Sequence, residues 1–447
     1  MDLSAKSFSG VFVMLKRRVV FFTVCLCSAA VALARQPDSD TNFPVRVTVR
    51  LAEEKGVFYG EEALSATLHL TNGSSRKIDA VLISEITTDS GAPVTVLKDS
   101  VFLAEGGVAR QVVSHRAAAP GFYRVAAHLE VDGRKGAPAV FNLGYEPEKI
   151  ACASSAPPDF KAFWDGNLAA LAKVDARYSL VLVTNLCTAA VNLYEVRMRS
   201  FGEVVIGGHY AAPKKPGKYP VLVSFLGYGS GPHIPERADD GLIRYVASTR
   251  GQGVMKKENV YGDWMAYRLD SRDDYYFRGA FLDTVRAIDF VCSRPEVDTA
   301  RIAVGGGSQG GALSYVCAGL DRRVALCVPT IPGFCDIPNF IALTQWPGSV
   351  YRNYLARNDK GVTLATMCAM LAYYDVKNFA AGITCPVFMG VGLQDPICPT
   401  RTNFAPYNLL KGEKRYIIYP ETKHGVRGGD FYPKAGAWIR EKFGMTP

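Results

Sequence analysis

Several features that mark common protein classes are missing from this sequence of 447 residues. Its eleven cysteines form no C-x-x-C pair, so the spacing of a structural zinc site is absent. A formal net charge of +9 without a dense basic cluster gives little support to nucleic-acid binding. The sequence has no internal repeat and no low-complexity stretch, which excludes a solenoid and a disordered chain. The length exceeds that of one ordinary hydrophobic core, so we expect two folded units.

The N-terminal apolar run is also too short for a membrane span. It extends over about 15 residues, from Val19 to Leu33, whereas a bilayer requires roughly 20. Three basic residues (16–18) precede the run, and Ala32-Leu33-Ala34 ends it. This pattern predicts a signal peptide over residues 1–34, cleaved after Ala34, and a secreted or periplasmic protein that is not inserted in the membrane.

Cleavage removes four basic side chains, one acidic side chain and two cysteines, so that the mature chain has a net charge of +6 and nine cysteines. An odd number of cysteines in an oxidising compartment leaves at least one thiol unpaired. We expect most of these cysteines, including Cys317 and Cys327, to be buried small apolar residues.

Residues 35–148 have the pattern of an all-β domain. Alternating or β-branched segments recur there, separated by turn signals such as Asn72-Gly73 and Asp132-Gly133. Six or seven strands in roughly 100 residues predict an immunoglobulin-like β-sandwich. The predicted strands are 45–51, 64–71, 80–87, 94–103, 123–131 and 139–145.

Residues 149–447 instead alternate apolar strands with helices. Such a pattern predicts a mostly parallel, doubly wound sheet that helices cover on both faces. The predicted strands are 219–225, 245–248, 301–305, 385–392 and 415–420, and the predicted helices are 159–174, 278–293 and 311–320.

The glycine-rich stretch 304–314, "VGGGSQGGALS", joins a predicted strand to a predicted helix. Within it, Gly306-Gly307-Ser308-Gln309-Gly310 matches the G-x-S-x-G nucleophile elbow of α/β-hydrolases, which exposes a serine on a strained turn. A phosphate-binding loop would require a following Lys-Ser/Thr pair, which is absent. The stretch also fits G-x-G-x-x-G, but no acidic residue ends a strand about 20 positions later, as dinucleotide binding would require.

The triad of such an enzyme follows the order Ser, then Asp or Glu, then His. His424 is the only histidine after Ser308, and it follows the last predicted strand. Asp395 is the preferred acid because it directly follows a buried-type strand, at the edge of the sheet where functional side chains gather. The oxyanion hole would use the backbone N–H groups of Gln309 and Tyr228. The other acids considered are Asp321, Asp336, Asp359 and Asp375.

Several long segments resemble the acetyl xylan esterase and cephalosporin-C deacetylase family, carbohydrate esterase family 7 of the α/β-hydrolases. They are "STRGQG" (248–253), "YYFRGAFLDTVRAIDFV" (275–291), "GGSQGG" (306–311) and "DVKNFAAGITCPVFMGVGLQDPICPT" (375–400), within a resemblance that covers about residues 157–440. The family's nucleophile, acid and base correspond to Ser308, Asp395 and His424. The chain departs from the family's usual H-G-Y at Leu226 and from its usual His-Glu at Gly425.

The resemblance implies a serine esterase that hydrolyses acetyl esters of carbohydrates, without a metal or organic cofactor, and it suggests a homo-oligomer. Arg250 and Gln252 of the R-G-Q-G segment either contact substrate or hold loops together. The aromatic residues of segment 333–374 either stack on sugars or pack a lid or a subunit contact. One alternative is a prolyl-oligopeptidase-like peptidase, but such enzymes carry a β-propeller, and the N-terminal 110 residues are too few to form one. The other is a carbohydrate-binding or assembly protein with a silent hydrolase domain.

Overall fold

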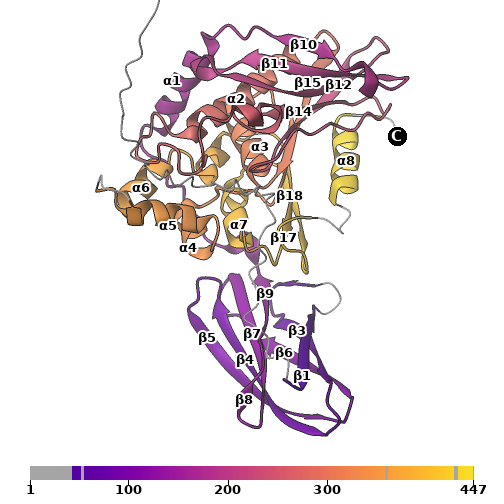
Figure 1. The fold of residues 1–447 in the computed structure, drawn as a ribbon, viewed down its shortest axis with the longest axis vertical. Helices are drawn as coiled ribbons and strands as arrows, with labels where there is room; N and C mark the ends of the chain where they lie inside the picture. Colours follow the sequence, from indigo (N-terminus) through magenta and orange to yellow (C-terminus); the bar gives the residue numbers. More distant parts are fainter. Residues whose placement is uncertain (1–42, 52–54, 358–360, 427–430, 446–447) are drawn as a thin grey trace, which may run out of the picture. The chain divides into compact units, whose positions relative to one another are not determined.

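The computed structural model describes residues 43–51, 55–357, 361–426 and 431–445 (Figure 1). The predicted signal peptide, residues 1–34, lies outside the described residues. Within these ranges, no helix has both the length and the apolar character required to cross a membrane. The division of the chain near residue 148 remains a prediction.

The N-terminal part, indigo to purple in Figure 1, is all β-structure. The first sheet has the order β1-β3-β6, and the second has the order β2-β9-β7-β4-β5 with β8 paired to β7. Alternate residues of β3 are buried, so one face of this strand packs into the core. The predicted β-sandwich is therefore confirmed. Its strands are β1 (Val45–Arg50), β2 (Val57–Phe58), β3 (Leu64–Asn72), β4 (Ile78–Thr88), β5 (Pro93–Leu103), β6 (Val108–His115), β7 (Gly121–Val131), β8 (Arg134–Lys135) and β9 (Ala139–Tyr145).

The rest of the chain builds a mixed nine-stranded sheet with the order β10-β11-β12-β14-β13-β15-β16-β17-β18. The six strands from β14 to β18 in this order are parallel, whereas β10, β11 and β12 pair antiparallel. The sheet is therefore mostly parallel, as predicted. Its strands are β10 (Ser179–Leu182), β11 (Val191–Arg199), β12 (Val205–Pro213), β13 (Tyr219–Phe225), β14 (Ile243–Ser248), β15 (Val297–Gly307), β16 (Leu326–Thr330), β17 (Val387–Gly392) and β18 (Lys414–Tyr419).

Helices cover both faces of this sheet. Successive residues of a strand point to opposite faces, and the buried neighbours Ala303 and Val304 of β15 belong to different hydrophobic clusters. Ala303 packs in the cluster of helix α8, whereas Val304 packs in that of α2 and α3. The helices are α1 (Phe160–Ala172), α2 (Tyr276–Cys292), α3 (Gln309–Leu320), α4 (Ile337–Leu343), α5 (Gly348–Arg357), α6 (Leu364–Leu371), α7 (Thr400–Leu409) and α8 (Phe431–Lys442).

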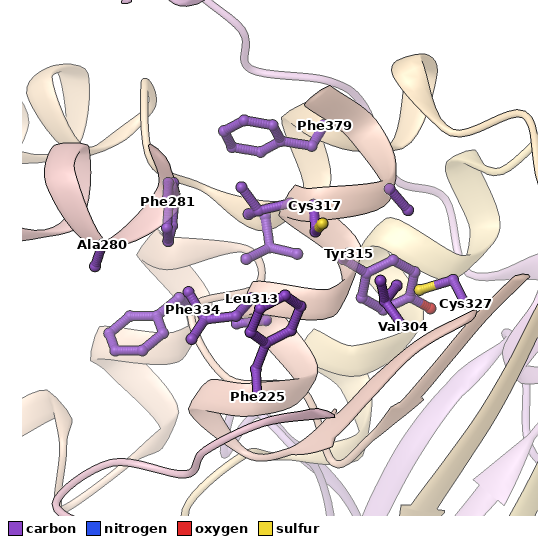
Figure 2. Packing of buried hydrophobic residues seen from close by; sticks show 14 of the residues in the cluster. Phe225, Ala280, Phe281, Val304, Leu313, Tyr315, Cys317, Cys327, Phe334 and Phe379 are labelled. Carbon is purple, nitrogen blue, oxygen red and sulfur yellow. The ribbon is translucent and has the colours of Figure 1, made fainter. Parts of the chain in front are cut away.

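The core around α3 includes two of the cysteines. Figure 2 shows Cys317 and Cys327 among aromatic and aliphatic side chains such as Phe281 and Phe379. Both cysteines are fully buried, which confirms the prediction that they act as small apolar residues. All nine cysteines within the described residues are free thiols.

Candidate active site

Ser308 lies on the turn between β15 and α3, at the carboxyl edge of the parallel strands. Its φ of 58° and ψ of −119° are unusual for a residue with a side chain, and such a conformation costs about 1–3 kcal/mol. The flanking glycines explain how the turn fits. A Cβ on Gly306 or on Gly310 would lie only 2.5 or 2.1 Å from the carbonyl oxygen of Phe225. The G-x-S-x-G pattern therefore reflects the close approach of the elbow to β13.

His424 and Asp395 form a hydrogen-bonded chain with this serine. His424 Nε2 lies 3.1 Å from Ser308 Oγ, and His424 Nδ1 lies 2.8 Å from Asp395 Oδ2. The histidine belongs to the loop after β18, and its side chain is 23% exposed, whereas the Asp395 carboxylate is fully buried. The structure thus brings together the three side chains that the sequence predicted as a triad.

The loop that carries Asp395 fixes the orientation of its carboxylate. Asp395 Oδ1 accepts hydrogen bonds from the backbone N–H groups of Ile397 at 2.8 Å and Cys398 at 2.9 Å. Oδ2 is the oxygen nearer to the imidazole, because His424 Nδ1 lies 2.8 Å from Oδ2 and 3.1 Å from Oδ1. The Thr400 hydroxyl donates to the carbonyl of Gly392 at 3.0 Å, which ties the end of the loop to β17.

The other acids considered from the sequence have different partners. Asp321 pairs with Arg323 at 2.6 Å, and Asp336 pairs with Lys377 at 2.7 Å. Asp375 is buried and accepts hydrogen bonds from three backbone N–H groups, those of residues 336, 337 and 377. Asp359 lies outside the described residues. Among the described acids considered, Asp395 is therefore the one hydrogen-bonded to His424.

The predicted oxyanion donors lie on two segments that meet at the elbow. Gln309 is the first residue of α3, where the N–H groups have no partner within the helix. Tyr228 lies in the loop after β13, and a Cβ on its neighbour Gly227 would be 3.5 Å from the carbonyl oxygen of Gly307. The Tyr228 hydroxyl donates to Asp263 at 2.9 Å, and its ring packs edge-on against Trp264 at 4.9 Å. These contacts hold the loop in place.

Gln252 links these two segments. It is fully buried, and its Oε1 accepts the Gly229 N–H at 3.2 Å and Gln309 Nε2 at 3.2 Å. Its Nε2 donates to the Tyr276 hydroxyl at 2.8 Å. Gln309 Nε2 also lies 3.4 Å from the carbonyl oxygen of Leu226. This contact uses the backbone of residue 226, so it does not depend on which side chain that residue carries. The amide of Gln252 thus holds the Tyr228 loop next to the start of α3.

Arg250 is buried beneath the same loops. Its guanidinium makes an ion pair with the fully buried Asp283 of α2, with Nη2 2.8 Å from Oδ1 and Nε 2.9 Å from Oδ2. Such paired donors make a bidentate hydrogen-bonded bridge. A Cβ on Gly279 would lie 2.0 Å from Arg250 Nη1, so the helix leaves room for the guanidinium only at a glycine. Both polar residues of the R-G-Q-G segment therefore hold loops together in this structure.

Sequence reasoning missed Cys398, which lies beside the three side chains of the predicted triad. Its thiol is buried, and burial raises its pKa well above the ordinary range. Asp395, Cys398 and His424 have side-chain ligand atoms within 4.8 Å of one another, as a metal site would require. Both ring nitrogens of His424 are already hydrogen-bonded, however, and the thiol is protonated. Binding a metal here would require breaking these hydrogen bonds and losing the thiol proton.

The order of the sheet and the strained turn at the end of β15 define an α/β-hydrolase. The chain matches the acetyl xylan esterase (AXE1) family model over residues 142–440. The chain belongs to this family and is a carboxylic ester hydrolase.

Relatives of known name agree with this assignment. The acetyl esterase Axe7A of Xylanibacter ruminicola is 32% identical over 338 residues, which cover 72% of this chain and 75% of that protein. The structure of acetyl xylan esterase 1 from Thermoanaerobacterium sp. JW/SL YS485 is 29% identical, with a TM-score of 0.60, over 67% of this chain and 98% of that one. The structure of the acetyl xylan esterase from Paenibacillus sp. R4 is 30% identical, with a TM-score of 0.60, over 67% of this chain and 99% of that one.

Proposed function

We propose that this chain is a secreted esterase that removes acetyl groups from sugar hydroxyls, with Ser308 as the nucleophile. The observation that carries this proposal is the chain of hydrogen bonds from Ser308 through His424 to Asp395, on a strained elbow of an acetyl xylan esterase family member. A hydrogen-bonded base and a buried acid behind it activate a serine hydroxyl for attack on an ester carbonyl.

In the proposed mechanism, Ser308 Oγ attacks the acetyl carbonyl carbon while His424 Nε2 takes the hydroxyl proton. Asp395 accepts a hydrogen bond from the Nδ1–H group of the imidazole, which keeps that proton on Nδ1 and leaves Nε2 free to accept the serine proton. The backbone N–H groups of Gln309 and Tyr228 stabilise the tetrahedral oxyanion. The imidazolium then returns its proton to the leaving sugar oxygen. Water, deprotonated by His424, releases acetate from the acetyl-enzyme by the same route.

The substrate class follows from the relatives. The two similar solved structures are of acetyl xylan esterases, and the curated relative is an acetyl esterase. Acetylated xylo-oligosaccharides are therefore the first substrates to test. Secretion rests on the sequence pattern of residues 1–34 alone. N-terminal sequencing of the exported protein is expected to begin at Arg35, and a mature protein that retains residues 1–34 would contradict secretion by cleavage.

The experiment that tests the proposal measures acetate release from p-nitrophenyl acetate and from acetylated xylo-oligosaccharides. It compares the mature wild type with Ser308→Ala and with the control Ser293→Ala, which alters a hydroxyl at the end of α2 that donates to Phe290. We expect Ser308→Ala to lose at least about two orders of magnitude in kcat on both substrates, and the control to retain activity. A wild type inactive on acetylated saccharides would refute the proposed substrate class.

A further inference from the structure

One aromatic side chain in the segment between β16 and η6 (Val376–Gly382) differs from the others in exposure. Trp346 is 42% exposed, whereas four of the seven aromatic residues there are buried at 6% exposure or less. The buried four are Phe334, Phe340, Tyr351 and Tyr374, and the other two, Tyr354 and Tyr373, are partly buried against the same core. The buried residues serve the hydrophobic core, so the structure separates Trp346 from them. Its exposure calls for a different explanation.

Trp346 lies next to the proposed oxyanion loop. Its ring packs against that of Tyr228, with centroids 5.8 Å apart and an interplanar angle of 68°. Trp264 and Asp263 hold the same tyrosine, as described above. The segment that carries Trp346 also contacts the elbow, because the Gly333 N–H donates to the carbonyl oxygen of Ser308 at 3.1 Å. The exposed indole is therefore a single side chain away from a residue proposed to bind the reacting ester.

The turn that carries Trp346, between α4 and α5, is held rigidly. The buried Thr344 hydroxyl donates to Phe340 at 2.6 Å and accepts the Gly348 N–H at 2.8 Å. Arg352 Nη2 donates to the carbonyl oxygens of Thr344 at 3.0 Å and Gln345 at 3.1 Å. These bonds enclose Trp346 on both sides along the chain. A ring fixed before binding contributes more affinity, since less conformational freedom is lost when the ligand arrives.

We infer that Trp346, supported by Tyr228, stacks on the pyranose ring of the acetylated sugar and selects carbohydrate esters over small acetyl esters. The C–H groups on one face of a pyranose form an apolar surface that suits a flat aromatic ring, while the hydroxyl groups at its edge remain in water. Binding pockets commonly combine such aromatic walls with a few fixed polar groups. This inference rests on the proposed function and adds to it a residue that determines specificity.

The test compares Trp346→Ala and Trp346→Phe with the wild type on acetylated xylobiose and on p-nitrophenyl acetate. The control is Phe102→Ala, which removes another exposed aromatic ring, on β5. We expect Trp346→Ala to lower kcat/KM for acetylated xylobiose about tenfold, mainly through KM. Activity on p-nitrophenyl acetate is expected to change by less than about twofold. Trp346→Phe should recover most of the loss, because a smaller aromatic face remains.

Several outcomes would overturn the inference. Equal losses on both substrates would mean that Trp346 only supports the structure of the site. If the wild type is active on acetylated xylobiose and Trp346→Ala has the same KM for it, the stacking inference would be refuted and the proposed function would stand. A smaller oligomer on size-exclusion chromatography of Trp346→Ala would assign the ring to a subunit contact instead. A wild type that hydrolyses p-nitrophenyl acetate but no acetylated saccharide would refute the proposed substrate class itself.

Discussion

The substitution Asp395→Asn tests the proposed role of the acid with almost no change in shape. In the wild type, Oδ1 accepts hydrogen bonds from the N–H groups of Ile397 and Cys398 and lies 3.1 Å from His424 Nδ1, whereas Oδ2 lies closer to that nitrogen, at 2.8 Å. An asparagine must keep its oxygen toward the two N–H groups, because its NH₂ group has no hydrogen-bond acceptor there. The NH₂ group then occupies the position of Oδ2 and donates to Nδ1.

This reversal places the imidazole in the wrong tautomer. With Nδ1 accepting, the ring proton resides on Nε2, which lies 3.1 Å from Ser308 Oγ and can no longer take the serine proton. The corresponding change in a serine protease triad lowers kcat about 10⁴-fold, or about 5 kcal/mol of transition-state stabilisation. We expect a loss of similar size here, with KM and the thermal midpoint of unfolding nearly unchanged, since the two backbone hydrogen bonds remain.

The assay is the initial rate of p-nitrophenyl acetate hydrolysis, together with the circular dichroism melting curve of the same preparation. Asp395→Ala serves as a comparison, because it removes both the acceptor for the imidazole and the acceptor for the two N–H groups. We expect it to lower the melting temperature as well as the rate. If Asp395→Asn retained activity within about tenfold of the wild type, the acid would not set the tautomer, and the proposed mechanism would be wrong.

Three further predictions concern the surrounding network. Gln252→Leu should lower kcat by about tenfold to a hundredfold with little change in KM, because the two segments proposed to form the oxyanion hole lose their link. Steady-state kinetics would measure both parameters, and an unchanged kcat would refute the link. Arg250→Ala should reduce the free energy of unfolding by about 3–5 kcal/mol, because it leaves the Asp283 carboxylate buried and unpaired; urea unfolding measures this, and a loss below about 1 kcal/mol would contradict it. Burial raises the pKa of Asp375 to about 6 from its ordinary 3.8, so its contribution to stability is present below the ordinary value and is lost as the pH rises through about 6. Relative to Asp375→Asn, the wild type should therefore lose up to about 3 kcal/mol between pH 4 and 7, and parallel pH profiles for the two proteins would refute this.

The parts of the fold that could be predicted from the sequence are the strands and helices whose own residues show a clear apolar run or apolar periodicity. Strand β13 was predicted at 219–225 and is found there, because a central parallel strand is apolar throughout. The strands that were not predicted are β2, β6, β8, β10, β11, β12 and β16. The exposure of the edge strand β6 alternates, but valines 108 and 112 lie on its exposed face, so apolar and polar residues do not alternate along its sequence. Strand β10 is mostly exposed although its sequence is apolar, so it does not show this pattern either.

The positions of Ser308, Asp395 and His424 after strands were predictable because chain order and strand ends place such residues at one sheet edge. The contacts that depend on packing between distant segments were not predictable. The pairing of Arg250 with Asp283 joins residues 33 positions apart, and the hydrogen bond of Gln309 to Gln252 joins residues 57 positions apart. Segment 333–374 illustrates the same limit, since only packing in three dimensions distinguishes the exposed Trp346 from its buried aromatic neighbours.

The most direct test of the central claim is to label the mature enzyme with a fluorophosphonate and locate the modified residue by peptide mass spectrometry. This reagent forms a stable bond with a serine that an adjacent base has activated. We predict a single label on Ser308, formed in step with the loss of esterase activity and absent from Ser308→Ala. A label on another serine that accompanies the loss of activity, or full esterase activity in Ser308→Ala, would contradict the account.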